Sequence, residues 1–131
     1  MGRYDALNGL LLKGDGRGNF KPLTITESGI YIPGNGKAMV SLRGINNRYL
    51  VAASQNRGAL KIYELRNNSN ILALLTDDTA GELTLKNGTS RKLEFYYGSS
   101  FLSQSSRFLN TSDSTSSVVV FNNSGKSRKL K

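Results

Sequence analysis

The stretch that begins at Tyr96 carries the densest set of side chains able to bind a polar ligand. Aromatic rings, a hydroxyl and an amide follow one another closely, at Tyr96, Tyr97, Phe101, Ser103 and Gln104. Such groups together suit contacts to a sugar or a peptide. The alternative is structural, with Tyr97 and Phe101 filling the core and the serines satisfying backbone groups of turns. We take these five residues as the predicted ligand-binding surface.

A glycine-rich loop, Gly14 to Gly18, has the composition of a phosphate-binding loop. Dinucleotide-binding loops open a helix, but here Phe20-Lys21-Pro22 begins a strand, and the Lys-Ser/Thr pair of a P-loop is missing. Calcium loops need several carboxylates at alternating positions, whereas Asp15 is followed at position 17 by Arg. We therefore interpret this loop as a turn and predict no phosphate site and no metal site.

Catalytic chemistry is restricted by what the chain lacks. It contains no His and no Cys, so the commonest general base near neutral pH and any thiol nucleophile are missing. Asp77 and Asp78 are adjacent carboxylates, which diverge on an extended chain or cap a turn. A carboxylate pair assembled across strands cannot be read from sequence. We predict that the chain is not an enzyme and uses no cofactor.

The charge raises a second binding hypothesis. Eighteen Lys and Arg residues oppose nine Asp and Glu residues, a formal net charge of +9, so a polyanion such as RNA is a candidate partner. The cations are spread along the chain, without an aromatic-rich ribonucleoprotein strand or a helix-turn-helix. Solubility alone explains such a charge. For the polyanion alternative, the predicted contacts are the basic C-terminal residues Lys126, Arg128, Lys129 and Lys131.

Composition and turn spacing set the elements that must position these residues. A chain of 131 residues with 37% apolar residues, 14 Gly and two Pro suits short strands joined by tight turns. No apolar stretch approaches the roughly 20 residues that span a bilayer, and we predict no membrane insertion by this chain. The first residues contain no signal-peptide core, and we expect the chain to be a fragment of a longer protein.

Two turns predict hairpins most clearly. Gln55 to Gly58 separates strands at 48–54 and 59–65, and we predict a type I turn with Gly58 left-handed. Asn87-Gly88 separates strands at 82–86 and 91–97, the second with Leu93, Phe95 and Tyr97 on one face. We expect the strand at 48–54, apolar on both faces, to be central. Further strands are predicted at 10–12, 20–25, 37–43, 71–75, 116–121 and 126–131, with a polar boundary at 66–70.

The C-terminal half resembles a known family. Gly98-Ser99-Ser100-Phe101-Leu102-Ser103-Gln104-Ser105-Ser106-Arg107, with Val118-Val119-Val120 and Gly125-Lys126-Ser127 after it, is similar to the ASPIC/UnbV domain, which has such a turn between two strands. Upstream, residues 9–20 resemble the second half of an FG-GAP (VCBS) repeat, a blade of integrin-α-like β-propellers. The Asp-rich calcium loop of that repeat is missing, so the resemblance does not extend to calcium.

The resemblance implies an architecture and a location. We predict an all-β fold of antiparallel strands, with residues 1–66 as propeller-like strands and 70–131 as a small β-sandwich, the two able to pack as one compact unit. It also implies a secreted or cell-surface protein of the Bacteroidetes kind. The predicted function is a non-catalytic, extracellular binding or structural module for carbohydrate or a surface protein. RNA or another polyanion is the alternative partner, and the ligand's identity is left open.

Overall fold

The chain folds into short antiparallel strands. The structure, a computed structural model, describes residues 8–65, 69–98 and 104–131. Within these residues strands dominate, helix is limited to single turns, and every strand pairing is antiparallel. The predicted all-β class with antiparallel strands is confirmed.

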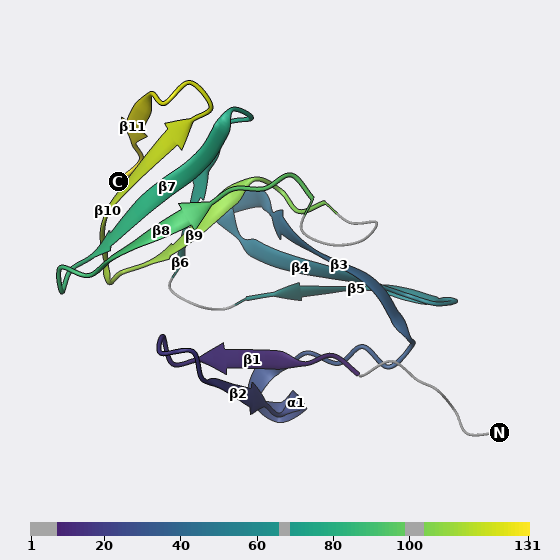
Figure 1. The fold of residues 1–131 in the computed structure, drawn as a ribbon. Helices are drawn as coiled ribbons and strands as arrows, with labels where there is room; N and C mark the ends of the chain where they lie inside the picture. Colours follow the sequence, from purple (N-terminus) through teal and green to yellow (C-terminus); the bar gives the residue numbers. More distant parts are fainter. Residues whose placement is uncertain (1–7, 66–68, 99–103) are drawn as a thin grey trace.

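The N-terminal strands form a hairpin that lies at one end of the molecule (Figure 1). Pro22 pairs across it with Leu12, and an edge strand tolerates proline because no neighbour needs the missing N–H. Thr24 and Glu27 then form a capping box around one turn of helix. The elements are β1 (Leu11–Gly14), β2 (Phe20–Leu23) and α1 (Ile25–Ser28).

A three-stranded meander follows, made of β3 (Gly36–Arg43), β4 (Tyr49–Gln55) and β5 (Gly58–Glu64), with a 3₁₀ turn, η1 (Ile45–Asn47), between β3 and β4. The central strand is β4, as predicted, and Val51, Ala52 and Ala53 in its middle are buried. The turn between β4 and β5 differs from the prediction. Arg57, not Gly58, has the positive φ of 55°, because Gly58 already pairs with Gln55 as the first residue of β5.

The C-terminal strands enclose the main core. A four-stranded sheet in the order β11-β10-β7-β8 packs against the ribbon β6-β9. Val118 and Val120 of β10 and Leu83 of β7 are buried, and leucines of the ribbon contact them. This arrangement is a small β-sandwich-like unit. Its strands are β6 (Ser69–Ala73), β7 (Asp78–Leu85), β8 (Ser90–Glu94), β9 (Phe108–Ser112), β10 (Thr115–Asn122) and β11 (Ser127–Lys129).

Along β8 and the residue after it, apolar and polar side chains alternate as the sequence predicts. Leu93 and Phe95 face the core, while Lys92 and Glu94 are exposed. Phe95 packs over Gly81, where an added Cβ would lie 3.0 Å from its ring. Gly81 thus makes room for the ring. Strand β9, by contrast, was not predicted, since its single apolar pair, Phe108-Leu109, follows a serine-rich stretch.

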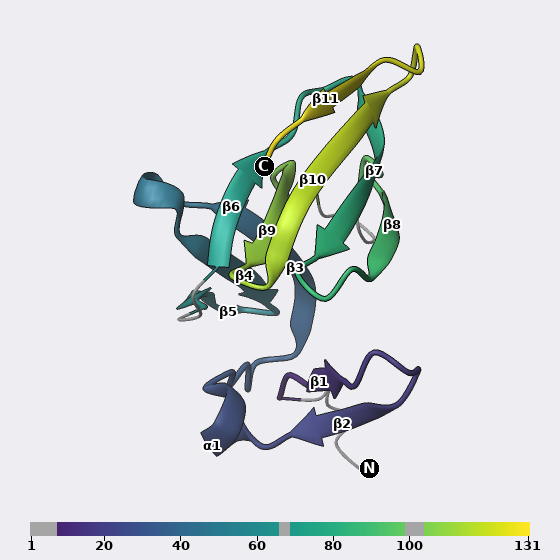
Figure 2. The ribbon, with the colours of Figure 1, turned by 90° about the vertical axis from the view of Figure 1, so that its left-hand side faces the viewer.

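Contacts join the meander to the sandwich. The rings of Tyr49 and Phe108 meet edge to face, with centroids 5.2 Å apart. Ser41 of β3 donates its N–H to Ser105 Oγ and accepts from the N–H of Ser106. Figures 1 and 2 show the two parts next to each other, with the β1–β2 hairpin at the far end from β11. Of the predicted boundary at 66–70, Ser69 and Asn70 are the first residues of β6, and positions 66–68 lie outside the described residues. The division into two parts and the propeller interpretation stay predictions.

Candidate functional site

Arg107 organises the surface on which the predicted ligand residues lie. It comes just before β9, and its guanidinium donates to three backbone carbonyls, those of Leu75, Asp78 and Tyr96. Its carbon Cζ also lies 4.2 Å from the centroid of the Tyr97 ring, a cation–π distance. One side chain therefore ties the end of β8 to the segment between β6 and β7.

The side chains of Tyr96 and Tyr97 differ in how strongly contacts within the protein fix them. Tyr96 is 73% exposed and Tyr97 is 60% exposed. The Tyr97 hydroxyl donates to the carbonyl of Thr76 while its ring stacks on Arg107, so its position is fixed by the protein. The alternative interpretation, in which Tyr97 fills the core, is wrong, because β8 ends at Glu94 and the chain turns toward Arg107. Tyr96 presents its ring to solvent.

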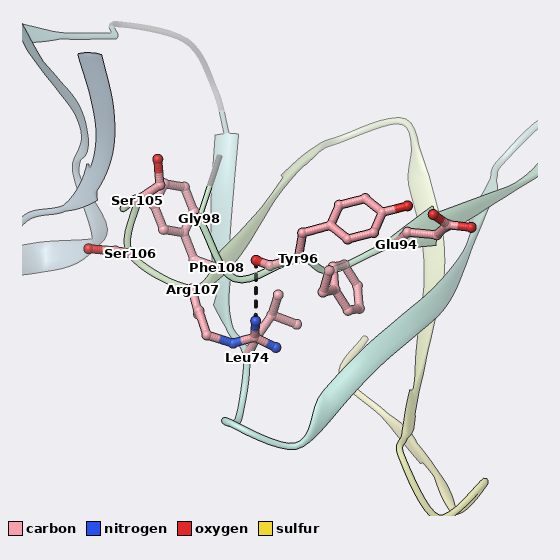
Figure 3. A pocket seen from close by; sticks show the side chains of 9 residues that line it. Leu74, Glu94, Tyr96, Gly98, Ser105, Ser106, Arg107 and Phe108 are labelled. Carbon is pink, nitrogen blue, oxygen red and sulfur yellow. Dashed lines mark hydrogen bonds between the residues drawn. The ribbon is translucent and has the colours of Figure 1, made fainter. Parts of the chain in front are cut away.

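A cavity of about 380 Å³ opens beside Tyr96 (Figure 3). Its walls combine apolar side chains with one carboxylate, one guanidinium and two hydroxyls. The lining residues are Leu74, Glu94, Phe95, Tyr96, Gly98, Ser105, Ser106, Arg107 and Phe108. A mostly apolar hollow with a few fixed polar groups is the usual form of a small-ligand site.

The structure brings only part of the predicted ligand set together. Tyr96 lines the cavity, and Tyr97 supports it through Arg107. Gln104 is exposed and is not among the lining residues. Phe101 and Ser103 lie outside the described residues, so their predicted role stays a prediction.

Tyr96 is the lining residue that belongs to the predicted ligand set, and four further polar lining residues do not belong to it, namely Glu94, Ser105, Ser106 and Arg107. Ser105 and Ser106 belong to the serine-rich stretch that suits either ligand contacts or turns, and both are held against β3 by their bonds to Ser41. A signal for Arg107 did exist, because it ends the Gly98–Arg107 stretch on which the family resemblance rests.

The predicted polyanion residues do not act as one set. The Nη2 atom of Arg128 lies 2.5 Å from Oδ2 of Asp78, a carboxylate that is 2% exposed. Oδ2 also accepts the N–H of Leu75 at 2.7 Å. Arg128 is thus committed to a structural ion pair, whereas Lys126 and Lys129 are exposed. The Lys131 backbone carbonyl accepts from Val118, which extends the β10–β11 pairing.

Asp77 and Asp78 diverge, as expected on an extended chain. Asp77 Oδ2 accepts from the Asn122 side chain, and its carbonyl accepts from the N–H of Asn123. Asp78 turns inward to Arg128. Neither carboxylate faces the other, so the pair has no arrangement for shared acid–base work.

The glycine-rich loop holds its own carboxylate. Asp15 Oδ1 accepts from the N–H groups of Arg17 and Asn19, and Oδ2 accepts from the Asn19 side chain at 2.7 Å. The Asn19 amide, followed by the Arg17 N–H, lowers the pKa of Asp15. The loop is a turn closed by its own aspartate, as predicted.

Comparison of the chain with protein-family models, curated proteins and solved structures finds no match. Among the described residues, no cluster of three or more acidic side chains could hold a metal ion. The helices in the described ranges are also too short to cross a membrane. The geometry around Tyr96 is therefore the feature of the chain that points to a function.

Proposed function

We propose that the chain is a non-catalytic binding module and that the cavity beside Tyr96 takes a carbohydrate. The observation that carries this proposal is an exposed tyrosine ring at the rim of a hollow that is also lined by Arg107, whose guanidinium is held by three backbone carbonyls. A flat aromatic face can cover the apolar face of a sugar ring, while hydroxyl and carboxylate groups bind its hydroxyls. Glu94 and Ser106 line the cavity and supply such groups, while the Ser105 hydroxyl oxygen already accepts the N–H of Ser41.

Preorganisation supports binding here. Arg107 fixes the carbonyl of Tyr96 and the ring of Tyr97, so little conformational entropy is lost when a ligand arrives. The resemblance that we infer from residues 98–107 to the ASPIC/UnbV domain, which no family model matches, leads us to propose a role at the cell surface or in a secreted protein. We extend the proposal to a module of adhesion or glycan handling.

A glycan array followed by calorimetry tests this site. Tyr96→Ala should weaken glycan binding by about tenfold or more, since an aromatic contact of 1.5 kcal/mol or so corresponds to that factor. The unfolding midpoint should hardly move, because the ring is exposed. Tyr31→Ala is the matched control, since Tyr31 is also an exposed tyrosine, at 47%, but lies in the N-terminal part of the chain. Equal binding by wild type and Tyr96→Ala would contradict the proposal.

The salt dependence of binding affinity distinguishes the polyanion alternative from carbohydrate binding. Neutralising several phosphates makes affinity fall steeply with salt, whereas sugar contacts hardly respond. Four residues lie side by side across the sheet, in the order Lys129, Val119, Glu82 and Lys92. Val119 and Glu82 separate the two lysines, so this row does not form a continuous basic face. Substituting Lys126, Lys129 and Lys131 together tests this alternative. Arg128→Ala does not, because it also breaks the pair with Asp78.

A further inference from the structure

Along β5, the backbone N–H and C=O groups of successive residues point alternately toward β4 and away from it. The N–H of Leu65 donates to the carbonyl of Tyr49, and the register pairs Val51 with Tyr63 and Ala53 with Lys61. Hydrogen-bonded pairs alternate along an antiparallel ladder. The N–H and C=O groups of Leu60, Ile62 and Glu64 therefore point away from β4.

These outward groups lack a strand partner. In the described part of the chain, β5 pairs with β4 alone. The opposite edge of the same sheet is different, because Ser41 of β3 is met there by Ser105 and Ser106. Exposed edges of this length are normally blunted or covered, since they add strands from other chains.

The side chains along this edge are apolar and exposed. Leu60 and Ile62 share one face and are 60% and 59% exposed. Where β5 ends, a cavity of about 500 Å³ opens between Tyr63–Leu65, Leu11 and the Thr26–Ile30 segment. Figure 1 shows β1 and α1 on that side of β5. A strand laid along β5 would therefore place an end residue in a partly apolar pocket.

Charge gives the edge a direction. Arg57 lies directly before the first residue of β5 and Lys61 lies at its middle, whereas Glu64 and Glu27 line the cavity at its end. Glu64 is partly balanced by Arg48, whose Nη1 lies 3.6 Å from its carboxylate. A segment running antiparallel to β5 starts at the acidic end and finishes at the basic end. It is best matched by a basic N-terminal part and an acidic C-terminal part.

We propose that β5 is a docking edge for one extended segment of a partner protein, which adds as an antiparallel fourth strand with alternating apolar side chains and an acidic C-terminal end. Backbone hydrogen bonds supply most of the affinity in this mode of recognition, and alternate side chains supply specificity. The site is separate from the cavity at Tyr96, and the proposal does not depend on the carbohydrate assignment.

The probe is a fluorescein-labelled peptide of seven residues, the length of β5. It alternates valine and threonine, with lysine at its N-terminal end and two glutamates at its C-terminal end. One control peptide has the charges exchanged between its ends, and another carries N-methyl groups on the amides that face β5. By fluorescence anisotropy, we expect each control to bind about tenfold or more weakly, because edge hydrogen bonds or charge matching is lost.

Variants of the protein test the edge from its own side. Ile62→Pro removes an outward N–H, which an edge strand tolerates, and should weaken peptide binding about tenfold. Ile62→Val keeps the N–H and should bind like wild type. Bound peptide should slow hydrogen exchange at the amides of Leu60, Ile62 and Glu64 and leave Lys61 and Tyr63 unchanged.

Equal affinity of the N-methylated and unmodified peptides overturns the proposal, and this comparison uses unaltered protein, so it holds even if Ile62→Pro does not fold. Absence of binding by every peptide also overturns it. A concentration-dependent dimer in sedimentation that Ile62→Pro abolishes assigns the edge to a second copy of the chain and overturns the partner named here.

Discussion

At the scale of single residues, the ion pair between Asp78 and Arg128 has the largest expected effect on stability. Asp78 is 2% exposed and Arg128 36% exposed, so removing the arginine leaves a carboxylate buried without its counter-charge. We expect Arg128→Met to lower the free energy of unfolding by about 3 kcal/mol, at the low end for buried pairs because Arg128 reaches solvent. Urea unfolding measures it.

The double substitution Asp78→Leu with Arg128→Met is the control for that prediction. Removing both charges avoids an unpaired buried carboxylate, so the double variant should be more stable than Arg128→Met alone. If the two variants unfold at the same urea concentration, the pair does not carry the effect.

Arg107 leads to a second prediction at this scale. Its planar guanidinium donates to three carbonyls and stacks on one ring. A lysine ammonium cannot reproduce that geometry. We expect Arg107→Lys to cost about 2 kcal/mol of stability and to broaden the NMR signals of the Tyr96 and Tyr97 rings. Lys92→Arg, an exposed substitution on β8, is the control. Unchanged tyrosine signals in Arg107→Lys would contradict the role of Arg107 in holding the two tyrosines.

Neither arginine role could be read from sequence. Asp78 and Arg128 are 50 positions apart, and Arg107 and Asp78 are 29 apart. A pairing over such a distance depends on which strands become neighbours. The sequence identifies Tyr96 because an aromatic beside a turn is a local feature, but the groups that hold it in place come from other strands.

At the scale of elements, the turn between β4 and β5 carries a local strain that can be removed. Arg57 has a φ of 55°, a conformation that costs an L side chain more than it costs glycine. Relief of the left-handed conformation gains about 1 to 2 kcal/mol, and the greater freedom of glycine in the unfolded chain offsets about 0.4 to 1 kcal/mol of it. We therefore expect Arg57→Gly to raise the free energy of unfolding by about 0.5 to 1 kcal/mol. The mirror substitution is Gly88→Ala at a φ of 83°, which should destabilise by about 1 kcal/mol. In thermal unfolding, Arg57→Gly should raise the midpoint and Gly88→Ala should lower it. A lower midpoint for both variants would contradict the strain at Arg57.

The loop between β1 and β2 responds to pH through Asp15. Hydrogen bonds from Asn19 and Arg17 lower the pKa of its carboxyl in the folded chain. A depressed carboxyl pKa stabilises the fold above the unfolded pKa, and this contribution is lost as the pH falls through the folded value. The loop should therefore loosen below about pH 4.

Carbon NMR of the Asp15 carboxyl checks that prediction. Its titration midpoint should lie below the ordinary aspartate range, and Asn19→Ala should move it upward. Asn70→Ala, an exposed amide on β6, should leave it in place. A midpoint that does not respond to Asn19→Ala would show that the loop bonds do not set this pKa.

Hairpins were predictable at this scale and pairings between them were not. Asn87-Gly88 and the Gln55–Gly58 turn are local signals, so β4–β5 and β7–β8 follow from neighbouring residues. The pairing of β6 with β9 and of β7 with β10 joins strands far apart in the chain. Alternation indicates which face of a strand is buried, but not which strand lies beside it.

At the scale of the whole molecule, the core is unevenly distributed. Val118 and Val120 are fully buried in the sandwich. Among residues 8–65 of the N-terminal part, the buried apolar residues are Ile32 and three short side chains of β4. All four residues of β1 are exposed. Local stability follows buried apolar contact, and so it should decrease from the sandwich through the meander to the β1–β2 hairpin.

Native-state hydrogen exchange measures this order directly. We expect the amides of β7 and β10 to exchange only through global unfolding, those of β4 to exchange faster, and those of β1 and β2 fastest of all. The meander should depend on its contact with the sandwich, because the Tyr49–Phe108 ring pair joins them. Phe108→Leu should therefore speed exchange in β4 and leave β1 and β2 unchanged. Exchange of the β1–β2 amides at the rate of β10 would instead mean that the hairpin belongs to the same cooperative unit as the sandwich.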